Sequence, residues 1–344
     1  MSRPIETRKI QQTGGSTLIV SLPKEWTKEN RLKAGSRVGI KLQSDQTLLI
    51  VPKDEIAPQK ALETTLSIRV EDEPQAAARE FVSRYLAGYD IIQVNFEVGT
   101  SKHRNTLKET IRRKLMGVEI TDESMADLTA QCLLGYKELP VDRALSRMSL
   151  LASSMHKDAT NAFLAWDHSL ARDVKLRDDE VDRFYFFIVR QLKRAVINRS
   201  MIDSAGLQRP SEILGYRLIV KSVERVADHS ARIASMALLM DGPPESRTAK
   251  EIQEMSIASQ TIFDDAIKSL YKQNPKLAHE TIERTSEVVE FEEKIIDRLS
   301  GQKLTGGATA RLRIVLESIR RSAEYGSDVA EIVLNLLVDK EIQY

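Results

Sequence analysis

The stretch Leu218-Ile219-Val220-Lys221-Ser222-Val223-Glu224-Arg225-Val226-Ala227-Asp228-His229 is typical of the middle of a long helix, because residues 216–240 contain no Pro or Gly. Glu224 and Asp228 are four residues apart, so both carboxylates project from one helical face about a turn apart. Like charges at this spacing repel each other by roughly 0.2–0.5 kcal/mol. The pattern therefore predicts that basic side chains or a metal cation share this face.

The same spacing of acids recurs at Asp178/Asp182 and at Glu324/Asp328, within a region rich in helical apolar stripes. The sequence predicts six long helices, at 141–166, 170–200, 211–240, 249–271, 275–299 and 308–337. A Gly242-Pro243-Pro244 break separates the first three from the last three. This arrangement indicates an internal duplication of about a hundred residues, with one three-helix bundle over 139–241 and a second over 245–340.

Composition sets the broad class of the protein. The chain has 344 residues, of which 29% are charged and only 5% aromatic, a balance typical of helix-rich proteins with several domains. No apolar run is long enough to span a bilayer, and the first residues do not resemble a secretory signal. Cys132 is the only cysteine, which excludes an internal disulfide and a thiolate metal cage. We expect a soluble, cytoplasmic protein without membrane insertion.

The net charge of +1 hides a basic N-terminal region. Residues 1–53 contain ten Lys and Arg against four Asp and Glu, an excess of six positive charges. This region is punctuated like a small β domain, with a strand over 17–22, a short helix over 23–28 and a hairpin formed by 38–42 and 48–51. So few large apolar side chains cannot build a stable core alone, so we expect a homodimer with an anionic polymer as partner.

Four motifs in this region resemble the AbrB/MazE (SpoVT-AbrB) family of swapped-hairpin DNA-binding domains. They are Arg8-Lys9-Ile10-Gln11, Thr13-Gly14-Gly15-Ser16, Leu22-Pro23-Lys24-Glu25-Trp26 and Leu32-Lys33-Ala34-Gly35. The resemblance implies that two chains interleave their hairpins and bind double-stranded DNA. By their matching positions, Arg8, Lys9 and Lys24 are the residues that it implies at the DNA. The alternative for each single cation is an ordinary solvated surface charge.

A linker over 53–66 precedes a second small domain at 66–138. Alternating patterns predict strands at 66–70, 90–96, 118–120 and 128–133 and helices at 74–86 and 103–115, in the order β-α-β-α-β-β. We find no Gly-rich phosphate loop and no nucleophile elbow in this stretch. The sequence favours a spacer or oligomerisation module, with ligand sensing as the alternative.

The duplicated helices with acidic pairs resemble the PhoU family of phosphate-uptake regulators. The fragments that carry the resemblance are 177–182, 223–229 and 321–328. With the AbrB-like head, the whole chain is similar to archaeal transcription regulators of that family. The resemblance implies an adaptor in phosphate signalling, not an enzyme, that holds divalent or trivalent metal ions on the bundle surface. It implies one metal site made of Asp178, Asp182, Glu224 and Asp228.

A second metal site with Glu324 and Asp328 lacks its other half. Aligning the two repeats places Thr285 opposite Asp178 and Val289 opposite Asp182, and neither is a useful ligand. Glu293 and Asp297 form a similar pair two turns further along. Carboxylates alone suit Mg²⁺, Ca²⁺ or Mn²⁺, whereas the nearby His229 would admit Zn²⁺ or Fe.

The alternative to a metal is a set of internal salt bridges. Basic and acidic residues share one stripe on each of the two helices, so neighbouring cations can neutralise the acids. These stripes are Arg217, Lys221, Glu224 and Asp228 on one helix and Glu317, Arg321, Glu324 and Asp328 on the other. On this interpretation His229 is a helix-surface histidine.

Three functions follow from these patterns. The first is a DNA-binding transcription regulator of phosphate uptake whose helical body senses a metal or a partner protein. The second is a cytoplasmic PhoU-like adaptor that negatively modulates a phosphate transporter or its signalling kinase, with a head that mainly dimerises. The third, a metal-dependent hydrolase, lacks the histidine and carboxylate clusters that such chemistry needs.

Overall fold

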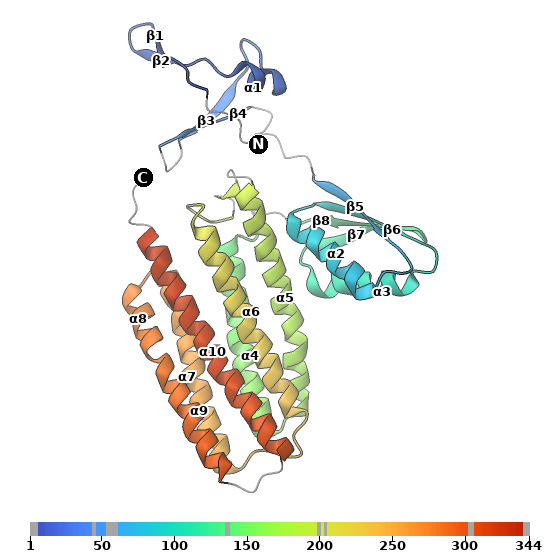
Figure 1. The fold of residues 1–344 in the computed structure, drawn as a ribbon, viewed down its shortest axis with the longest axis vertical. Helices are drawn as coiled ribbons and strands as arrows, with labels where there is room; N and C mark the ends of the chain where they lie inside the picture. Colours follow the sequence, from blue (N-terminus) through green and yellow to red (C-terminus); the bar gives the residue numbers. More distant parts are fainter. Residues whose placement is uncertain are drawn as a thin grey trace. The chain divides into compact units, whose positions relative to one another are not determined.

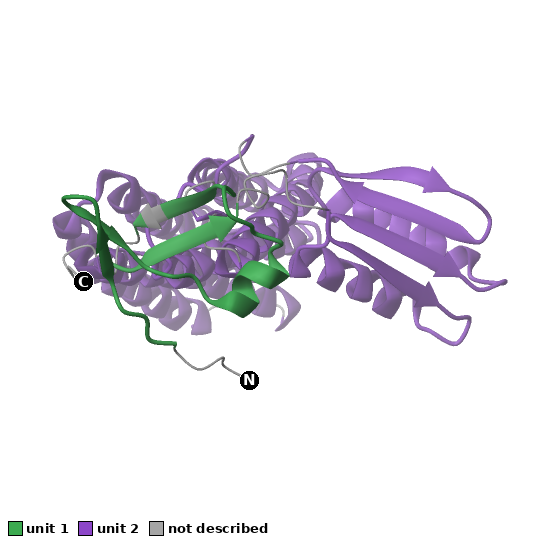
Figure 2. Ribbon diagram, turned by 90° about the horizontal axis from the view of Figure 1, so that it is seen from above, with its two compact units in different colours: residues 1–60, 344 green, residues 61–343 purple. Residues whose placement is uncertain are grey.

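The computed structural model describes residues 6–42, 46–52, 61–134, 138–197, 201–202, 205–301 and 306–339. Two compact units divide the chain after residue 60 (Figure 2). The first unit is the small β-hairpin region, called the head below. The second contains a small α/β domain and a long helical region (Figure 1). This multidomain architecture confirms the predicted fold class.

The head consists of two separate antiparallel hairpins and one short helix. Its elements are β1 (Gln11–Thr13), β2 (Thr17–Ile19), α1 (Lys24–Glu29), β3 (Val38–Leu42) and β4 (Leu48–Pro52). Gly14 lies at the β1–β2 turn with a φ of 61°, a left-handed conformation that glycine adopts without strain. The prediction missed β1, because Gln-Gln-Thr has no apolar alternation, and it extended the next strand beyond Ile19.

The described part of the head has almost no buried side chain. Pro52 at the end of β4 is the single buried residue, and large apolar side chains of both hairpins face solvent. Leu18, Ile40 and Leu42 are 67%, 65% and 68% exposed. One copy of the head therefore leaves its hydrophobic side chains without a core.

The middle domain, which contains residues 61–134, is a four-stranded sheet with two helices on one face (Figure 2). Its elements are β5 (Glu63–Ile68), α2 (Pro74–Ala87), β6 (Ile91–Phe96), α3 (Ser101–Lys114), β7 (Val118–Glu123) and β8 (Asp127–Cys132). The strand order is β5-β6-β8-β7, with β5 and β6 parallel and the other pairs antiparallel. The predicted element order is confirmed, although β5 begins inside the predicted linker, of which residues 53–60 lie outside the described residues.

Alternation along the strands places the apolar side chains of this sheet against the helices. Leu66, Val94 and Leu128 are buried on the helical face together with Phe81 of α2. Residues between them, such as Gln93, are exposed on the other face. The middle domain thus has a hydrophobic core of its own.

Long helices make up the rest of the second unit (Figure 1). They are α4 (Val141–Ala165), α5 (His168–Ile197), α6 (Glu212–Ala237), α7 (Ser246–Lys272), α8 (Pro275–Glu283), α9 (Thr285–Ser300) and α10 (Gly306–Asp339). Within the described residues, no helix is long and apolar enough to cross a membrane.

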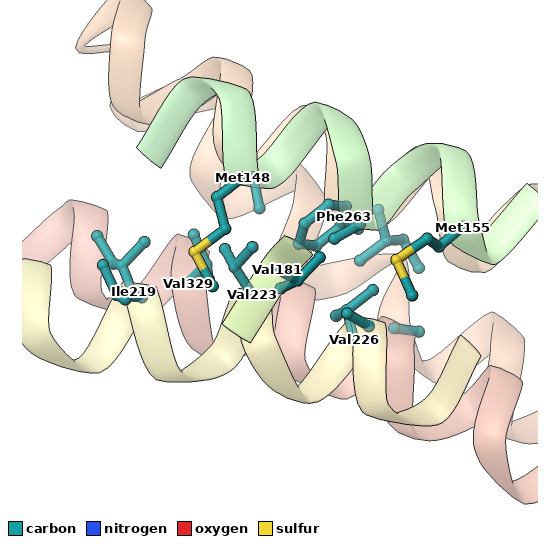
Figure 3. Close-up of a cluster of buried hydrophobic side chains, with 14 of the residues drawn as sticks. Met148, Met155, Val181, Ile219, Val223, Val226, Phe263 and Val329 are labelled. Atoms are coloured by element: carbon teal, nitrogen blue, oxygen red, sulfur yellow. The ribbon is translucent and has the colours of Figure 1, made fainter. Parts of the chain in front are cut away.

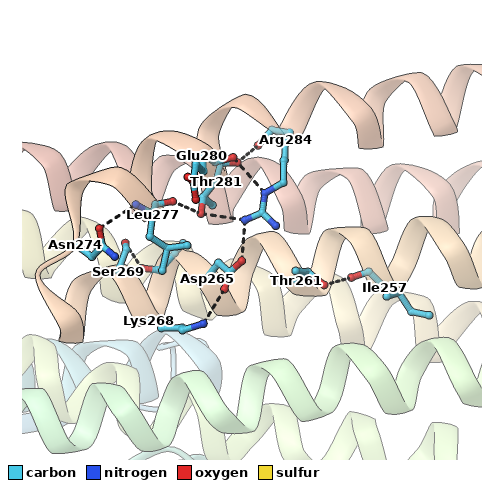
Figure 4. Close-up of polar contacts among 12 residues, drawn as sticks. Ile257, Thr261, Asp265, Lys268, Ser269, Asn274, Leu277, Glu280, Thr281 and Arg284 are labelled. Atoms are coloured by element: carbon cyan, nitrogen blue, oxygen red, sulfur yellow. Dashed lines mark hydrogen bonds and ion pairs between the residues drawn. The ribbon is translucent and has the colours of Figure 1, made fainter.

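The single helix predicted over 275–299 is wrong, because it is interrupted at Arg284. The Glu287 amide donates to the Arg284 carbonyl, a tight three-residue turn. The Arg284 side chain reaches α7, where Nη2 lies 2.8 Å from Asp265 Oδ2 (Figure 4). This contact joins the interruption to α7, and it depends on tertiary packing that no local pattern predicts.

Both halves of the duplication share one continuous hydrophobic core (Figure 3). Met148 of α4, Val181 of α5 and Val223 of α6 belong to it, as do Phe263 of α7 and Val329 of α10. Helices α6 and α10, which carry the acidic pairs of the two halves, pack against each other. The two three-helix halves are therefore joined through their cores.

Candidate functional site

The acidic pairs of the first half lie on two helices that pack together. Asp178 and Asp182 project from α5, and Glu224 and Asp228 project from α6. Each pair occupies one helical face because of its four-residue spacing. The charges of Asp182, Asp228 and Glu224 all act on Asp178, so the four carboxylates share one region. This region is called the acidic face below.

Two lysines neutralise part of the acidic face. Lys221 of α6 holds both carboxylate oxygens of Glu224, at 2.7 and 2.5 Å from Nζ. Lys114, the last residue of α3 in the middle domain, places Nζ 3.1 Å from Asp182 Oδ2. The predicted salt-bridge alternative is therefore present for Glu224, but the partner of Asp182 comes from another domain.

The other two carboxylates have no ion-pair partner within the described residues. Burial, followed by the charges of Asp182 and Asp228, raises the pKa of Asp178 to about 7. Burial and the charge of Glu224 raise the pKa of Asp228 to about 6. Solvent reaches Asp228, which is exposed, and screens part of this effect. Asp178 is half-buried, so uncompensated negative charge is concentrated there.

The fit of a metal ion to this face depends on how many oxygens remain free. Across the described ranges, no group of three or more His, Cys, Asp or Glu side chains is arranged to hold a metal ion. Lys114 and Lys221 engage Asp182 and Glu224, which leaves Asp178 and Asp228 as candidate ligands. Hard cations need six or more oxygens, many of them from the protein. In this arrangement the acidic face does not fit a metal ion, and metal binding stays a prediction.

The second half is neutralised by arginines. Glu324 forms ion pairs with Arg320 and with Arg321, whose Nη1 lies 2.5 Å from Oε2. Asp328 has no ion-pair partner in the described chain, and burial and the charge of Glu331 raise its pKa. Thr285 is the first residue of α9 and Val289 is half-buried one turn later.

An acid that the sequence prediction missed faces α10 from α9. Glu292 Oε2 lies 2.5 Å from Arg320 Nε, and only 12% of the Glu292 side chain is exposed. The predicted alternative pair, Glu293 and Asp297, is exposed. Glu292 shares the stripe of Val288, Ile295 and Leu299 at three- and four-residue spacings, and this periodicity is the signal that could have identified it.

The three predicted DNA-facing cations all lie on the surface of the head. Arg8 and Lys9 precede β1, and Lys24 is the first residue of α1. Arg8 forms an ion pair with Glu6, which the sequence prediction did not include. Lys9 and Lys24 are exposed. The head thus carries solvent-accessible cations next to exposed apolar hairpins.

A helical body of two related three-helix halves, preceded by a small β head, defines a class of regulatory and accessory proteins rather than a pocket enzyme. The model of the PhoU domain matches residues 145–237 and 252–333, more than half of the chain. The chain belongs to the PhoU family. The model of "Antidote-toxin recognition MazE, bacterial antitoxin" matches residues 11–57.

Relatives of known name cover the helical region. The chain is 22% identical over 202 residues to a phosphate-specific transport system accessory protein PhoU homolog of Clostridium acetobutylicum, covering 58% of this chain and 91% of that protein. A protein of the same name from Aquifex aeolicus is 27% identical over 162 residues, covering 45% and 69%.

Solved structures show the same fold. PhoU from Pseudomonas aeruginosa superposes with a TM-score of 0.52 at 20% identity, covering 58% of this chain and 96% of that one. The phosphate transport system regulatory protein PhoU from Streptococcus pneumoniae gives 0.50 at 14% identity, covering 59% and 95%. The predicted duplication is therefore that of the PhoU fold.

Proposed function

We propose that this protein is a DNA-binding transcription regulator of phosphate uptake that acts as a homodimer through its head. The observation that carries this proposal is the head itself: a basic hairpin domain, matched by the MazE model, in front of a PhoU body. The relatives named above are accessory proteins of a phosphate-specific transport system. We place this chain in the same process, in a regulatory and non-catalytic role.

The need for a dimer comes from the exposed apolar side chains of the head. Leu18 of β2, Ile40 and Leu42 of β3 and Leu48 of β4 are each 63–68% exposed in one chain. Removing about 100 Å² of apolar surface from water contributes roughly 2.5 kcal/mol. A second copy that pairs its hairpins with these would bury the same residues on both sides, as a two-fold interface requires.

DNA as the partner follows from charge. Residues 1–53 carry six more positive than negative charges, and Lys9 and Lys24 extend into solvent. Two heads in a dimer double this charge on one particle. Phosphate contacts of this kind make binding strongly dependent on salt.

The test is a titration of the full chain against duplex DNA by fluorescence anisotropy at several salt concentrations. We expect a dimer in light scattering and an affinity that falls steeply with salt. Lys9→Ala and Lys24→Ala should each lower the slope of log K against log salt by about 0.9 if the side chain contacts a phosphate. Lys157→Ala, which removes an exposed cation of α4, is the matched control and should leave the slope unchanged. A monomer, or a protein that ignores DNA at low salt, contradicts the proposal.

The second candidate is a PhoU-like adaptor that negatively modulates a phosphate transporter or its signalling kinase. The names of the two relatives favour it, since both are accessory proteins of a transport system. In this case the head only dimerises. A dimer that fails to bind any duplex at low salt would support the adaptor over the regulator.

A further inference from the structure

The middle domain contacts α5 at two places that differ in burial. Near the C-terminal end of α5, Arg190 and Arg194 both form ion pairs with Asp90, which precedes β6. Near its N-terminal half, Asp179 and Asp182 receive Arg113 and Lys114 from the end of α3. These two sets of contacts are called the anchor and the latch below.

The anchor is built into the protein interior. Arg190 is 3% and Arg194 9% exposed, and they also donate to backbone carbonyls of the middle domain, those of Tyr85 at 2.5 Å and Gly88 at 3.3 Å. Phe186, between anchor and latch, packs against the core of the middle domain. Breaking a buried, hydrogen-bonded ion pair is strongly destabilising, so the anchor holds the domain in place.

The latch is half exposed. The side chains of Arg113 and Lys114 are 51% and 44% exposed, and ion pairs of this kind contribute little to stability. Lys114 nevertheless lies where negative charge is concentrated. Burial opposes its charge, but the hydrogen bond to Asp182 and the charges of Asp182, Asp179 and Asp178 together raise the pKa of Lys114.

We propose that the middle domain docks on the acidic face in place of a metal ion, with the Lys114 ammonium as the resident cation. Docking of the α3 end and binding of a divalent cation to the same carboxylates then exclude each other. A hard divalent cation such as Mn²⁺ that engages Asp178 and Asp182 displaces Lys114 and opens the latch, while the anchor keeps the domain attached. This goes beyond the proposed function, because it involves neither the head nor DNA.

The geometry supplies a matched pair of variants for the test. Lys114→Met removes the ammonium and keeps most of the aliphatic stem. Lys108→Met removes an ammonium from the same helix, but Lys108 pairs with Glu123 inside the middle domain, at 2.6 Å, and not with α5. Both lysines are partly exposed, so both variants should fold.

The experiment measures Mn²⁺ binding to the full chain by calorimetry. We expect Lys114→Met to bind Mn²⁺ about fivefold more tightly than the wild type, because its competitor is gone, and Lys108→Met to match the wild type. In the wild type, Mn²⁺ should speed amide hydrogen exchange at residues 111–115 and leave residues 88–92 at the anchor protected. Equal Mn²⁺ affinity of the wild type and Lys114→Met, including no binding by either, overturns the proposal. So does Mn²⁺ binding that leaves exchange at 111–115 unchanged.

Discussion

Asp90 Oδ1 lies 2.7 Å from Arg190 Nη2, although 100 positions separate the two residues in the chain. Arg194 pairs with the same oxygen from the next turn of α5. One carboxylate therefore neutralises two buried guanidinium groups and fixes the middle domain to the helical region. A buried arginine has no deprotonated form available, so both depend on this partner.

Asp90→Asn should destabilise the second unit. The variant leaves two buried guanidinium groups without a negative charge, which we expect to lower the free energy of unfolding by about 3 kcal/mol. Urea denaturation followed by circular dichroism measures this. The control is Asp122→Asn on β7, an exposed residue whose loss should change stability by less than about 0.5 kcal/mol. Equal effects of the two variants would show that the anchor carries no special weight.

Asp178→Asn should stabilise the protein at alkaline pH. The folded-state pKa of Asp178 is raised to about 7, well above the model value of 3.8. The folded state therefore binds the proton more tightly, and the carboxyl's contribution is present below pH 4 and lost as the pH rises through 7. Because the residue is only half-buried, we expect a gain of about 1 kcal/mol for the variant at pH 8 and almost none at pH 4.

The measurement for Asp178→Asn is a pair of denaturation curves at the two pH values. Glu180→Gln, an exposed carboxyl on the same helix, is the matched control and should show no such pH dependence. A less stable Asp178→Asn at pH 8 would mean that the ionised carboxylate is favourable in the folded protein, against the expected sign.

Gly326→Ala should weaken the packing of α10 on α7. A Cβ at position 326 would lie 3.0 Å from the Phe263 backbone and 3.1 Å from a methyl of Ile262, closer than ordinary contacts. Ala favours a helix by about 1 kcal/mol over Gly, but overpacking costs about 1–3 kcal/mol. We expect a net loss of about 1 kcal/mol in thermal or urea denaturation. Gly307→Ala, at the exposed start of the same helix, should be neutral or stabilising.

His156 should make the helical core sensitive to acid. It is 1% exposed between α4 and α7, and its Nε2 lies 3.0 Å from Ser256 Oγ. Burial lowers its pKa to about 4, while an unfolded histidine titrates near 6.5. The stability due to neutral His156 is therefore complete above pH 6.5 and is lost as the pH falls towards 4.

The variant His156→Gln keeps a polar partner for Ser256 and removes the titration. Between pH 7.5 and 4.5 we expect the wild type to lose about 2 kcal/mol more stability than this variant, measured by urea denaturation at both values. His229, whose pKa burial also lowers to about 4, remains in both proteins, so the difference belongs to His156. Identical acid sensitivity of the two proteins would contradict the expectation.

Local spacing was enough to predict the acidic pairs and most of the helices. Glu224 and Asp228 share a face because a helix brings residues four apart together wherever it packs. The Gly242-Pro243-Pro244 break separates the halves for an equally local reason, since Pro cannot continue a helix. The shared core of the two halves was not predictable in this way, because it depends on which stripes face each other.

The partners of the acids were decided by tertiary structure. Lys221 neutralises Glu224 from three residues away, and the sequence alone predicts this pair. Lys114 reaches Asp182 across 68 positions, and Glu292 rather than Glu293 meets Arg320 because the interruption at Arg284 precedes α9. Such contacts form only when separate elements dock. The sequence by itself therefore determined which side chains are acidic and on which helical face they lie, whereas the docked fold decided which cation each one meets.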